Sequence, residues 1–378
     1  MSDVDQDVTF MKQALRVAAK GRGTTSPNPM VGAVVVAKGK VVGSGYHQEA
    51  GGPHAEVFAL QRAKSRSRLA TLYLTLEPCC HTEKRTPPCV PLIIQSGVRR
   101  VVVAMRDPNP QVAGRGIQQL KRAGIRVDVG CLKQESAKLN EVYIHWVKTG
   151  RPFVILKAAM TLDGKMATAT GESKWITGTQ AREHVHRLRS RVDSIAVGVN
   201  TVLQDNPQLT ARPSSRTGKA SGTRQPVRVI FDSALRIPLD AWVLKNIETN
   251  PTAIATTAQA SHKKMEQLRS KWVEVLVLPQ KAKRVSIRRC LQELGNMGIT
   301  SMIVEGGSEL NASFLREGLV NQICLFVAPV LLGGQNAKGL IGGLSPKRLV
   351  QKIGVSNIHI HPLGADMLIT GDLNSKPR

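Results

Sequence analysis

Residues 30–46 read MVGAVVVAKGKVVGSGY, in which two Val-rich runs flank a Lys-Gly-Lys turn. This pattern is typical of a β-hairpin. After this hairpin, the chain alternates between helix-like and strand-like segments. They are a helix beginning near His54, strands at 71–76, 99–105 and 125–130, and helices at 89–97 and 116–124. Such alternation predicts an α/β layer with helices on both faces of a sheet, complete by about residue 145.

A second α/β series follows the stretch HWVKTGRPF, residues 145–153, where Gly150 and Pro152 stand between periodic segments and indicate a boundary. Apolar runs predict strands at 153–160, 193–199, 227–232, 252–257, 272–278, 301–307 and 322–332, and helices at 180–191, 286–298 and 308–318. Because 378 residues exceed what one core usually organises, we expect two domains, residues 1–147 and 148–378.

The composition is that of an ordinary globular protein, with 42% hydrophobic and 21% charged residues. The first thirty residues lack the apolar segment of a secretory signal, and no stretch is long and apolar enough to span a bilayer. We therefore expect a cytoplasmic protein. Thiols stay reduced there, so clustered cysteines are better explained as metal ligands than as disulfides.

The charge is strongly basic, with 53 Lys and Arg against 27 Asp and Glu, a formal net charge of +26. Such a balance favours polyanionic partners, either nucleic acid or small ligands carrying phosphates. Aromatic residues make up only 3% of the chain, and no basic run is interleaved with the rings that would stack bases. The basic residues are spread over the whole length of the chain, which is typical of a solvated cationic surface. The sequence does not explain why the net charge is so large.

Three of the six cysteines lie between Cys79 and Cys89, downstream of an isolated His-x-Glu at residues 54–56. A catalytic zinc needs three protein ligands and one open position. In zinc deaminases, a His-x-Glu and a Pro-Cys leading to a second Cys hold the metal, while the Glu carries protons without binding it. We predict His54, Cys79 and Cys89 as zinc ligands and Glu56 as the catalytic residue.

The chemistry explains these residue types. Bound zinc lowers the pKa of its water towards neutrality, which yields a hydroxide that can attack an amidine-like ring carbon. Glu56 would take the proton and deliver it to the departing amine. The alternative is a structural zinc site, but such sites normally show two close ligand pairs and no additional Glu. Cys80 and His81, beside Cys79, are competing ligands.

Several stretches resemble the RibD family of bifunctional riboflavin biosynthesis proteins, in which a pyrimidine deaminase is fused to a reductase. They are SPNPMVGAVVV (26–36), GGPHAEVFAL (51–60), TLEPCCHTEKRTPPC (75–89), LKAAMTLDGKMAT (156–168) with its continuation 172–212, and VEGGSELNASFLREG (304–318). The resemblance implies a cytidine-deaminase-like three-layer domain followed by a dihydrofolate-reductase-like domain that binds NADPH. It also implies deamination of a diaminopyrimidinone carrying a phosphoribosylamino group, followed by reduction of its ribosyl group to ribityl.

By the same resemblance, Asn28, His47 and His81 hold the substrate around the zinc. The loop CCHTEKRTPPC departs from the family's usual CSHxGRTPPC, being one residue longer. That leaves open which of Lys84 and Arg85 approaches the substrate phosphate.

In the second domain, the Gly pair of VEGG stands between a strand and a helix, where backbone N–H groups can approach a phosphate. No G-x-G-x-x-G follows the first strand, which argues against an ordinary Rossmann domain. The resemblance implies cofactor contacts at Lys157, Ser173, Trp175, Thr201, Asp205, Glu305, Gly306 and Gly307, and substrate contacts at Arg189 and Arg212. A guanidinium fork suits a phosphate, which favours Arg189 as its partner. The proton donor is Asp205 or a bound water.

Two other function classes compete. A tRNA or single-stranded nucleic-acid deaminase shares the zinc motif and would account for the charge, but it needs no second α/β domain, and its binding would fall steeply with salt. A binding protein with structural zinc would be indifferent to Glu56→Ala. We expect a phosphorylated pyrimidine as substrate, Zn2+ and NADPH as cofactors, a homo-oligomer, and no nucleic-acid or membrane partner.

Overall fold

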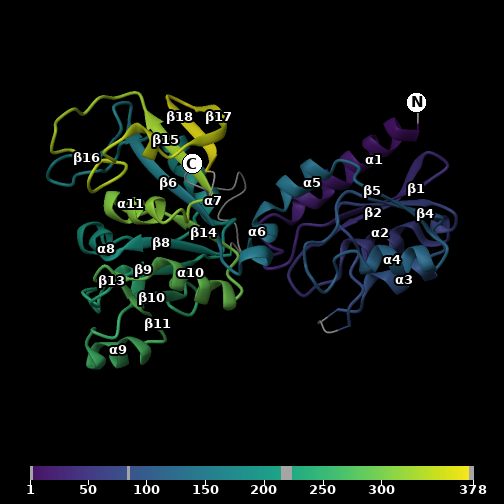
Figure 1. Cartoon of the computed structure of the whole chain (residues 1–378), viewed down its shortest axis with the longest axis horizontal. Helices are drawn as coiled ribbons and strands as arrows, with labels where there is room; N and C mark the ends of the chain where they lie inside the picture. Colours follow the sequence, from purple (N-terminus) through teal and green to yellow (C-terminus); the bar gives the residue numbers. More distant parts are fainter. Residues whose placement is uncertain (1–2, 83–85, 214–223, 374–378) are drawn as a thin grey trace. The chain divides into compact units, whose positions relative to one another are not determined.

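The computed structural model describes residues 3–82, 86–213 and 224–373. The chain divides into two compact units, unit 1 (Met1–Gly150) and unit 2 (Arg151–Arg378) (Figure 1). The expectation for Lys84 and Arg85 falls outside the described residues.

Unit 1 is built on a five-stranded sheet with the order β2-β1-β3-β4-β5. Its strands are β1 (Gly32–Ala37), β2 (Lys40–Tyr46), β3 (Thr71–Leu74), β4 (Arg100–Val103) and β5 (Arg126–Val129). β1 is antiparallel to β2 and β3, whereas β3, β4 and β5 run parallel. The predicted hairpin is confirmed: Lys38 and Gly39 connect β1 to β2 with φ of 49° and 74°, the left-handed backbone that a two-residue hairpin turn requires.

Helices cover both faces of this sheet, as the alternation predicted. Ala33 and Val35 of β1 pack with α2 (Ala55–Ala63), α3 (Cys89–Gln95) and α4 (Arg115–Arg122). Val34 and Val36 point the other way, into a second core that includes α1 (Asp3–Ala18). The period-two alternation of β1 therefore supplies both interfaces of a three-layer α/β/α domain. Two further helices, α5 (Lys133–Leu139) and α6 (Glu141–Thr149), complete unit 1.

Unit 2 contains a nine-stranded sheet with the order β11-β10-β9-β8-β14-β6-β15-β18-β17. The strands from β11 to β15 in this order are parallel, and β18 and β17 are antiparallel additions at one edge. Their bounds are β6 (Phe153–Thr161), β8 (Ser194–Gly198), β9 (Val227–Phe231), β10 (Thr252–Thr256), β11 (Glu274–Val277), β14 (Ser301–Val304), β15 (Gln322–Ala328), β17 (Val355–Leu363) and β18 (Asp366–Leu373). All seven predicted strands are present.

The helices of unit 2 are α7 (Thr179–Arg189), α8 (Val199–Asp205), α9 (His262–Arg269), α10 (Ile287–Asn296) and α11 (Ser308–Arg316). Short strands pair outside the main sheet: β7 (Lys165–Ala167) with β16 (Lys338–Gly339), and β12 (Gln280–Lys281) with β13 (Arg284–Val285). Leu156 of β6, Leu294 of α10 and Phe314 of α11 share one buried core.

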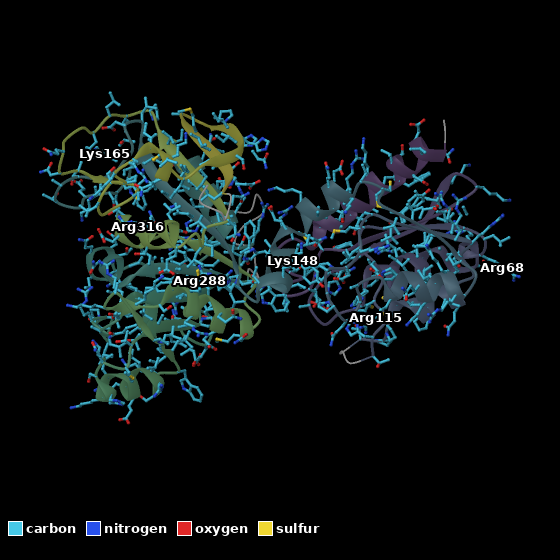
Figure 2. All side chains as sticks on the ribbon, in the orientation of Figure 1. Arg68, Arg115, Lys148, Lys165, Arg288 and Arg316 are labelled. Atoms are coloured by element: carbon cyan, nitrogen blue, oxygen red, sulfur yellow. The ribbon has the colours of Figure 1, made fainter. Side chains whose placement is uncertain are left out.

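Basic side chains lie on both units. Figure 2 shows Arg68, Arg115 and Lys148 on unit 1 and Lys165, Arg288 and Arg316 on unit 2. Within the described ranges, none of the helices has the length and apolarity needed to cross a membrane.

Candidate active sites

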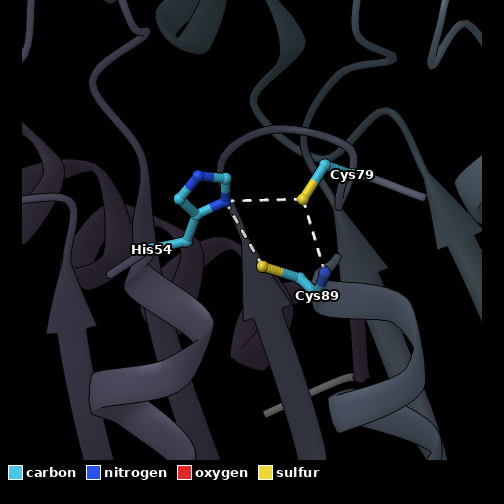
Figure 3. A group of neighbouring side chains, drawn as sticks. All are labelled: His54, Cys79 and Cys89. Carbon is cyan, nitrogen blue, oxygen red and sulfur yellow. Dashed lines mark hydrogen bonds between the residues drawn. The ribbon is translucent and has the colours of Figure 1, made fainter. Parts of the chain in front are cut away.

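Three segments of unit 1 bring the predicted zinc ligands together (Figure 3). His54 is the residue before α2, Cys79 lies in the loop after β3, and Cys89 begins α3. The Nδ1 atom of His54 lies 3.4 Å from Cys79 Sγ and 3.3 Å from Cys89 Sγ, and all three ligand atoms lie within 4.8 Å of one another. Nitrogen and sulfur ligands of one tetrahedral zinc are about 3.6 Å apart, given the usual bond lengths. The donor set and spacing therefore fit zinc.

Hydrogen bonds hold these ligands in place. The backbone N–H groups of Cys89 and Val90 donate to the Cys79 carbonyl at 3.1 and 3.3 Å, so the start of α3 anchors the preceding loop. His54 Nε2 lies 3.3 Å from Thr86 Oγ1. If Nε2 donates to this hydroxyl, Nδ1 presents its lone pair to the two sulfurs, the tautomer a metal ligand needs. Within the described ranges, the group able to hold a metal contains neither Cys80 nor His81.

Glu56 lies in the first turn of α2 and is only 2% exposed. Its Oε2 atom is buried and has no hydrogen-bond partner among the residues that the structure describes. Burial, followed by the nearby Cys79 sulfur, raises the pKa of the Glu56 carboxyl above its ordinary value. A buried carboxylate oxygen without a partner, beside a metal-binding triad, is suited to accept a proton from a bound molecule.

His54, Glu56 and Cys79 line a cavity of about 530 Å³, which is also lined by Asn28, His47 and His81. His47 Nδ1 lies 3.1 Å from the Pro53 carbonyl, which can only accept, so the proton sits on Nδ1. His47 Nε2 then accepts from the Asn28 amide nitrogen at 3.0 Å. His81 Nδ1 is buried without a partner among the described residues.

Unit 2 has a larger cavity of about 790 Å³, and all ten predicted ligand-binding residues line it. They are Lys157, Ser173, Trp175, Arg189, Thr201, Asp205, Arg212, Glu305, Gly306 and Gly307. Thr201 and Asp205 follow β8, and Glu305 follows its parallel neighbour β14. Ligands of open parallel sheets bind beyond the carboxyl ends of the strands, which is where this cavity lies.

A buried ion-pair cluster lies in this cavity. Arg189 binds Glu305 with two parallel hydrogen bonds, Nε to Oε1 at 2.8 Å and an Nη to Oε2 at 2.9 Å, and Lys157 Nζ lies 3.2 Å from Oε2. These cations lower the pKa of Glu305 despite its burial. Another Arg189 nitrogen donates to the Thr210 carbonyl at 3.1 Å. The Arg189 guanidinium, which we expected to bind a phosphate, is thus bound by the Glu305 carboxylate.

The Gly306-Gly307 pair leads from β14 into α11. A Cβ on Gly306 would come within 2.8 Å of Leu310, so the first glycine permits close packing of the helix. A Cβ on Gly307 would meet nothing within 4 Å, so this position faces open space. Gly306, Gly307 and Ser308 line the cavity, so α11 begins at the cavity wall, and a helix N-terminus in this place suits a phosphate group of a dinucleotide.

Comparison with known proteins shows the family. The RibD C-terminal domain matches residues 152–369, and the cytidine and deoxycytidylate deaminase zinc-binding region matches residues 4–105. Riboflavin biosynthesis protein RibD of Actinobacillus pleuropneumoniae is 44% identical over 363 residues, covering 96% of this chain and 94% of that protein. The chain belongs to the RibD family. RibD of Aquifex aeolicus is 45% identical over 366 residues, covering 96% and 97%.

Solved RibD structures agree over the full length. Acinetobacter baumannii RibD has a TM-score of 0.89 at 37% identity, covering 99% of this chain and all of that one. A deaminase/reductase from Thermotoga maritima has a TM-score of 0.83 at 36% identity, with the same coverage. The chain is therefore a bifunctional enzyme of riboflavin biosynthesis, with a zinc-binding deaminase domain and an NADPH-dependent reductase domain of dihydrofolate-reductase-like fold. The second domain separates it from a nucleic-acid deaminase.

The structure adds three RibD cavity residues that the motifs did not indicate: Asp107, Asn109 and Tyr143. Asp107 accepts from the Tyr143 hydroxyl at 3.0 Å and the Asn109 N–H at 2.9 Å, and burial raises its pKa to about 6. Glu77, the Glu of EPC, accepts from the Asp107 N–H at 3.2 Å. The position of Asp107 in the sequence could have indicated its place in the cavity. It follows β4, the parallel neighbour of β3, and ligands bind beyond the carboxyl ends of such strands.

Proposed function

We propose that unit 1 of this RibD deaminates a diaminopyrimidinone carrying a phosphoribosylamino group, and that unit 2 uses NADPH to reduce the ribosyl group of the product to ribityl. The Thermotoga maritima relative is described as a diaminohydroxyphosphoribosylaminopyrimidine deaminase and 5-amino-6-(5-phosphoribosylamino)uracil reductase. The observation that carries the proposal is the buried, unpartnered Glu56 Oε2 beside the His54, Cys79 and Cys89 triad. We assign the deaminase to residues 1–147 and the reductase to residues 148–378.

In the deaminase, His54, Cys79 and Cys89 hold zinc, which when bound supplies a Lewis acid that lowers the pKa of a water molecule. Glu56 takes the proton of the attacking water at its Oε2 atom and delivers it to the departing amine. His47 fixes the Asn28 amide by accepting from its nitrogen, and this leaves the Asn28 oxygen as an acceptor for the pyrimidine. His81 contributes a second polar contact.

In the reductase, NADPH supplies the hydride. Gly306, Gly307 and the start of α11 receive a cofactor phosphate, and Lys157 and Glu305 are further cofactor contacts. We propose that Arg189 acts by holding Glu305, and that Arg212 is the phosphate contact. Arg212 is exposed, and one of its nitrogens donates to Gln208 at 3.0 Å. Ser173, Trp175 and Thr201 complete the cofactor contacts, with Asp205 or a bound water as the proton donor.

We further propose that the chain forms homo-oligomers through unit 2. Exposed large apolar side chains concentrate between residues 330 and 360: Val330, Leu331, Leu332, Ile341, Leu344, Leu349, Val350, Ile353, Val355, Ile358 and Ile360. The last three belong to β17, which ends the sheet and pairs only with β18. Their exposed area is on the order of 1,000 Å², against about 800 Å² per partner in a standard interface. A second copy would cover this 330–360 apolar segment.

We place this chemistry in the cytoplasm, because thiolate ligands require reduced cysteines. The test of the proposed activities is to incubate the zinc-loaded chain with the phosphoribosylamino-diaminopyrimidinone, with and without NADPH, and follow product masses. We expect replacement of NH2 by OH in both samples and a gain of two hydrogens only with NADPH. An unchanged substrate with zinc confirmed bound would refute the proposal.

A further inference from the structure

The cations that line the reductase cavity have different surroundings. Lys157 and Arg189 bind Glu305, and Arg212 donates to Gln208. Arg182 donates to the Thr177 carbonyl at 2.7 Å and the Thr179 hydroxyl at 3.1 Å, and it stacks over the Trp175 ring. Each of these four cations is therefore at least partly engaged by the protein itself.

Lys338 also lines this cavity, but its ammonium has no hydrogen bond or ion pair within the described part of the chain. Among the described residues Lys174 also lacks a partner, yet its side chain is exposed to water. Lys338 is only half-exposed. An ammonium that is partly removed from water without an ion-pair partner loses hydration, and a bound anion would compensate for that loss.

The fold holds Lys338 against the cavity wall. β16 pairs antiparallel with β7, placing Lys338 opposite Ala167. A Cβ on Gly171 would lie 3.3 Å from Lys338 Nζ and 3.9 Å from the Gln204 side-chain amide, so Nζ lies between the turn after β7 and helix α8. Gln204 directly precedes Asp205 of the expected cofactor contacts.

The chain beyond β16 is also tied down. The Asn311 side-chain amide donates to the Leu340 carbonyl at 3.1 Å, and the Gly342 N–H donates to the Ser308 carbonyl at 3.0 Å. Both bonds reach α11, the helix whose start borders the cavity. Lys338 is thus presented by a paired strand with its C-terminal side anchored.

We propose that Lys338 is a phosphate-binding residue of the reductase, donating from Nζ to a phosphate oxygen of a ligand in the cavity. This inference rests on the proposed function. Both ligands of that function carry phosphate, namely NADPH and the phosphorylated pyrimidine. The chemistry that Lys338 recognises is the same for either, so separate measurements on the two ligands identify which one it contacts.

The test uses the full zinc-loaded chain with Lys338→Met, which removes the charge, and Lys338→Arg, which keeps it. The matched control is Lys347→Met, on the same segment but exposed and outside the cavity. KM is measured for NADPH and for the deaminated pyrimidine separately, and NADPH binding is followed by its fluorescence. Loss of one charged hydrogen bond predicts a KM increase of about tenfold for one ligand in Lys338→Met. Lys338→Arg should recover most of the affinity, and Lys347→Met should match the wild type.

A rise confined to NADPH assigns Lys338 to a cofactor phosphate, and a rise confined to the pyrimidine assigns it to the substrate phosphate. The proposal is overturned if both KM values stay within about twofold of wild type, or if Lys347→Met weakens binding equally. The circular dichroism spectrum and the melting temperature of the same preparations report whether unit 2 of each variant is folded, because deaminase activity reports on unit 1 alone. A wild-type chain that neither binds NADPH nor reduces the pyrimidine would contradict the proposed function itself, a result distinct from a failure of Lys338.

Discussion

The position of Glu56 in the fold explains why its carboxyl group is suited to transfer a proton. It follows His54 by two residues on the first turn of α2, so the helix that presents the metal ligand also buries the carboxylate beside it. Burial disfavours the charged form, and the absence of a partner for Oε2 among the described residues leaves that atom available. The His-x-Glu pattern, combined with the Pro-Cys at residues 78–79 and with Cys89, predicted this pairing.

Replacing Glu56 by Gln should therefore stop proton transfer while preserving shape. We expect the deamination kcat to fall by about a thousandfold, a typical effect of removing a general acid–base. Zinc content, measured by atomic absorption, should stay at one per chain, and reduction of the deaminated pyrimidine should be unaffected. A variant that keeps more than a tenth of the wild-type kcat would contradict the role of Glu56.

Asp107 should make stability depend on pH. Its pKa is about 6 in the folded chain against an ordinary value of 3.8, so the folded state favours the protonated form. Stability from this group is present below pH 4 and is lost as pH rises through 6, by about 3 kcal/mol in total. The difference in unfolding free energy between wild type and Asp107→Asn, measured by urea titration, should change by this amount across that window. A difference constant from pH 4 to pH 7 would show that Asp107 titrates normally.

At the scale of elements, the helices and strands that could be predicted from the sequence were those with a regular pattern of apolar residues. β1, the first strand of the hairpin, and the central parallel strand β14 are buried on both sides, so their sequences are nearly continuous apolar runs. β17 was missed because its residues are mostly exposed and read HIHP where a buried strand would be apolar. The ion pairs of Glu305 with Arg189 and Lys157 could not be predicted from the sequence either, because the three residues come from segments that are far apart along the chain.

The junction between β14 and α11 offers a test at this scale. A Cβ on Gly307 meets nothing within 4 Å, so Gly307→Ala should leave the fold intact but occupy space at the cavity wall. We expect NADPH affinity, measured by fluorescence titration, to fall about tenfold with an unchanged melting temperature. Gly354→Ala is the matched control, because its Cβ would also meet nothing within 4 Å and it lies outside the cavity. Equal NADPH affinity in both variants would rule out a cofactor approach at Gly307.

At the scale of the whole molecule, each unit has its own core and its own cavity, and the described residues that line each cavity belong to that unit. The deaminase and reductase activities therefore belong to different units of one chain. The basic charge is spread over both units, and the 330–360 apolar segment itself carries Lys338, Lys347, Arg348 and Lys352 among its exposed apolar side chains. Burial of those apolar side chains would stabilise the surface.

The 330–360 segment should control assembly. Ile360→Asp places a charge on β17, where the wild-type side chain is 61% exposed, and should convert the oligomer to monomers in light scattering after size exclusion. Val41→Asp, at an exposed apolar position of unit 1, is the control and should leave the mass unchanged. A wild-type chain that is already monomeric would contradict the proposed assembly.

The proposed function requires two separate sites that act in a fixed order, and the decisive experiment measures NADPH oxidation by the zinc-loaded Glu56→Gln chain. Supplied with the deaminated phosphoribosylamino pyrimidine, this chain should oxidise NADPH at the wild-type rate; supplied with the diaminopyrimidinone, it should oxidise almost none. Equal oxidation with both compounds would show that reduction does not depend on prior deamination, and would contradict the proposed order.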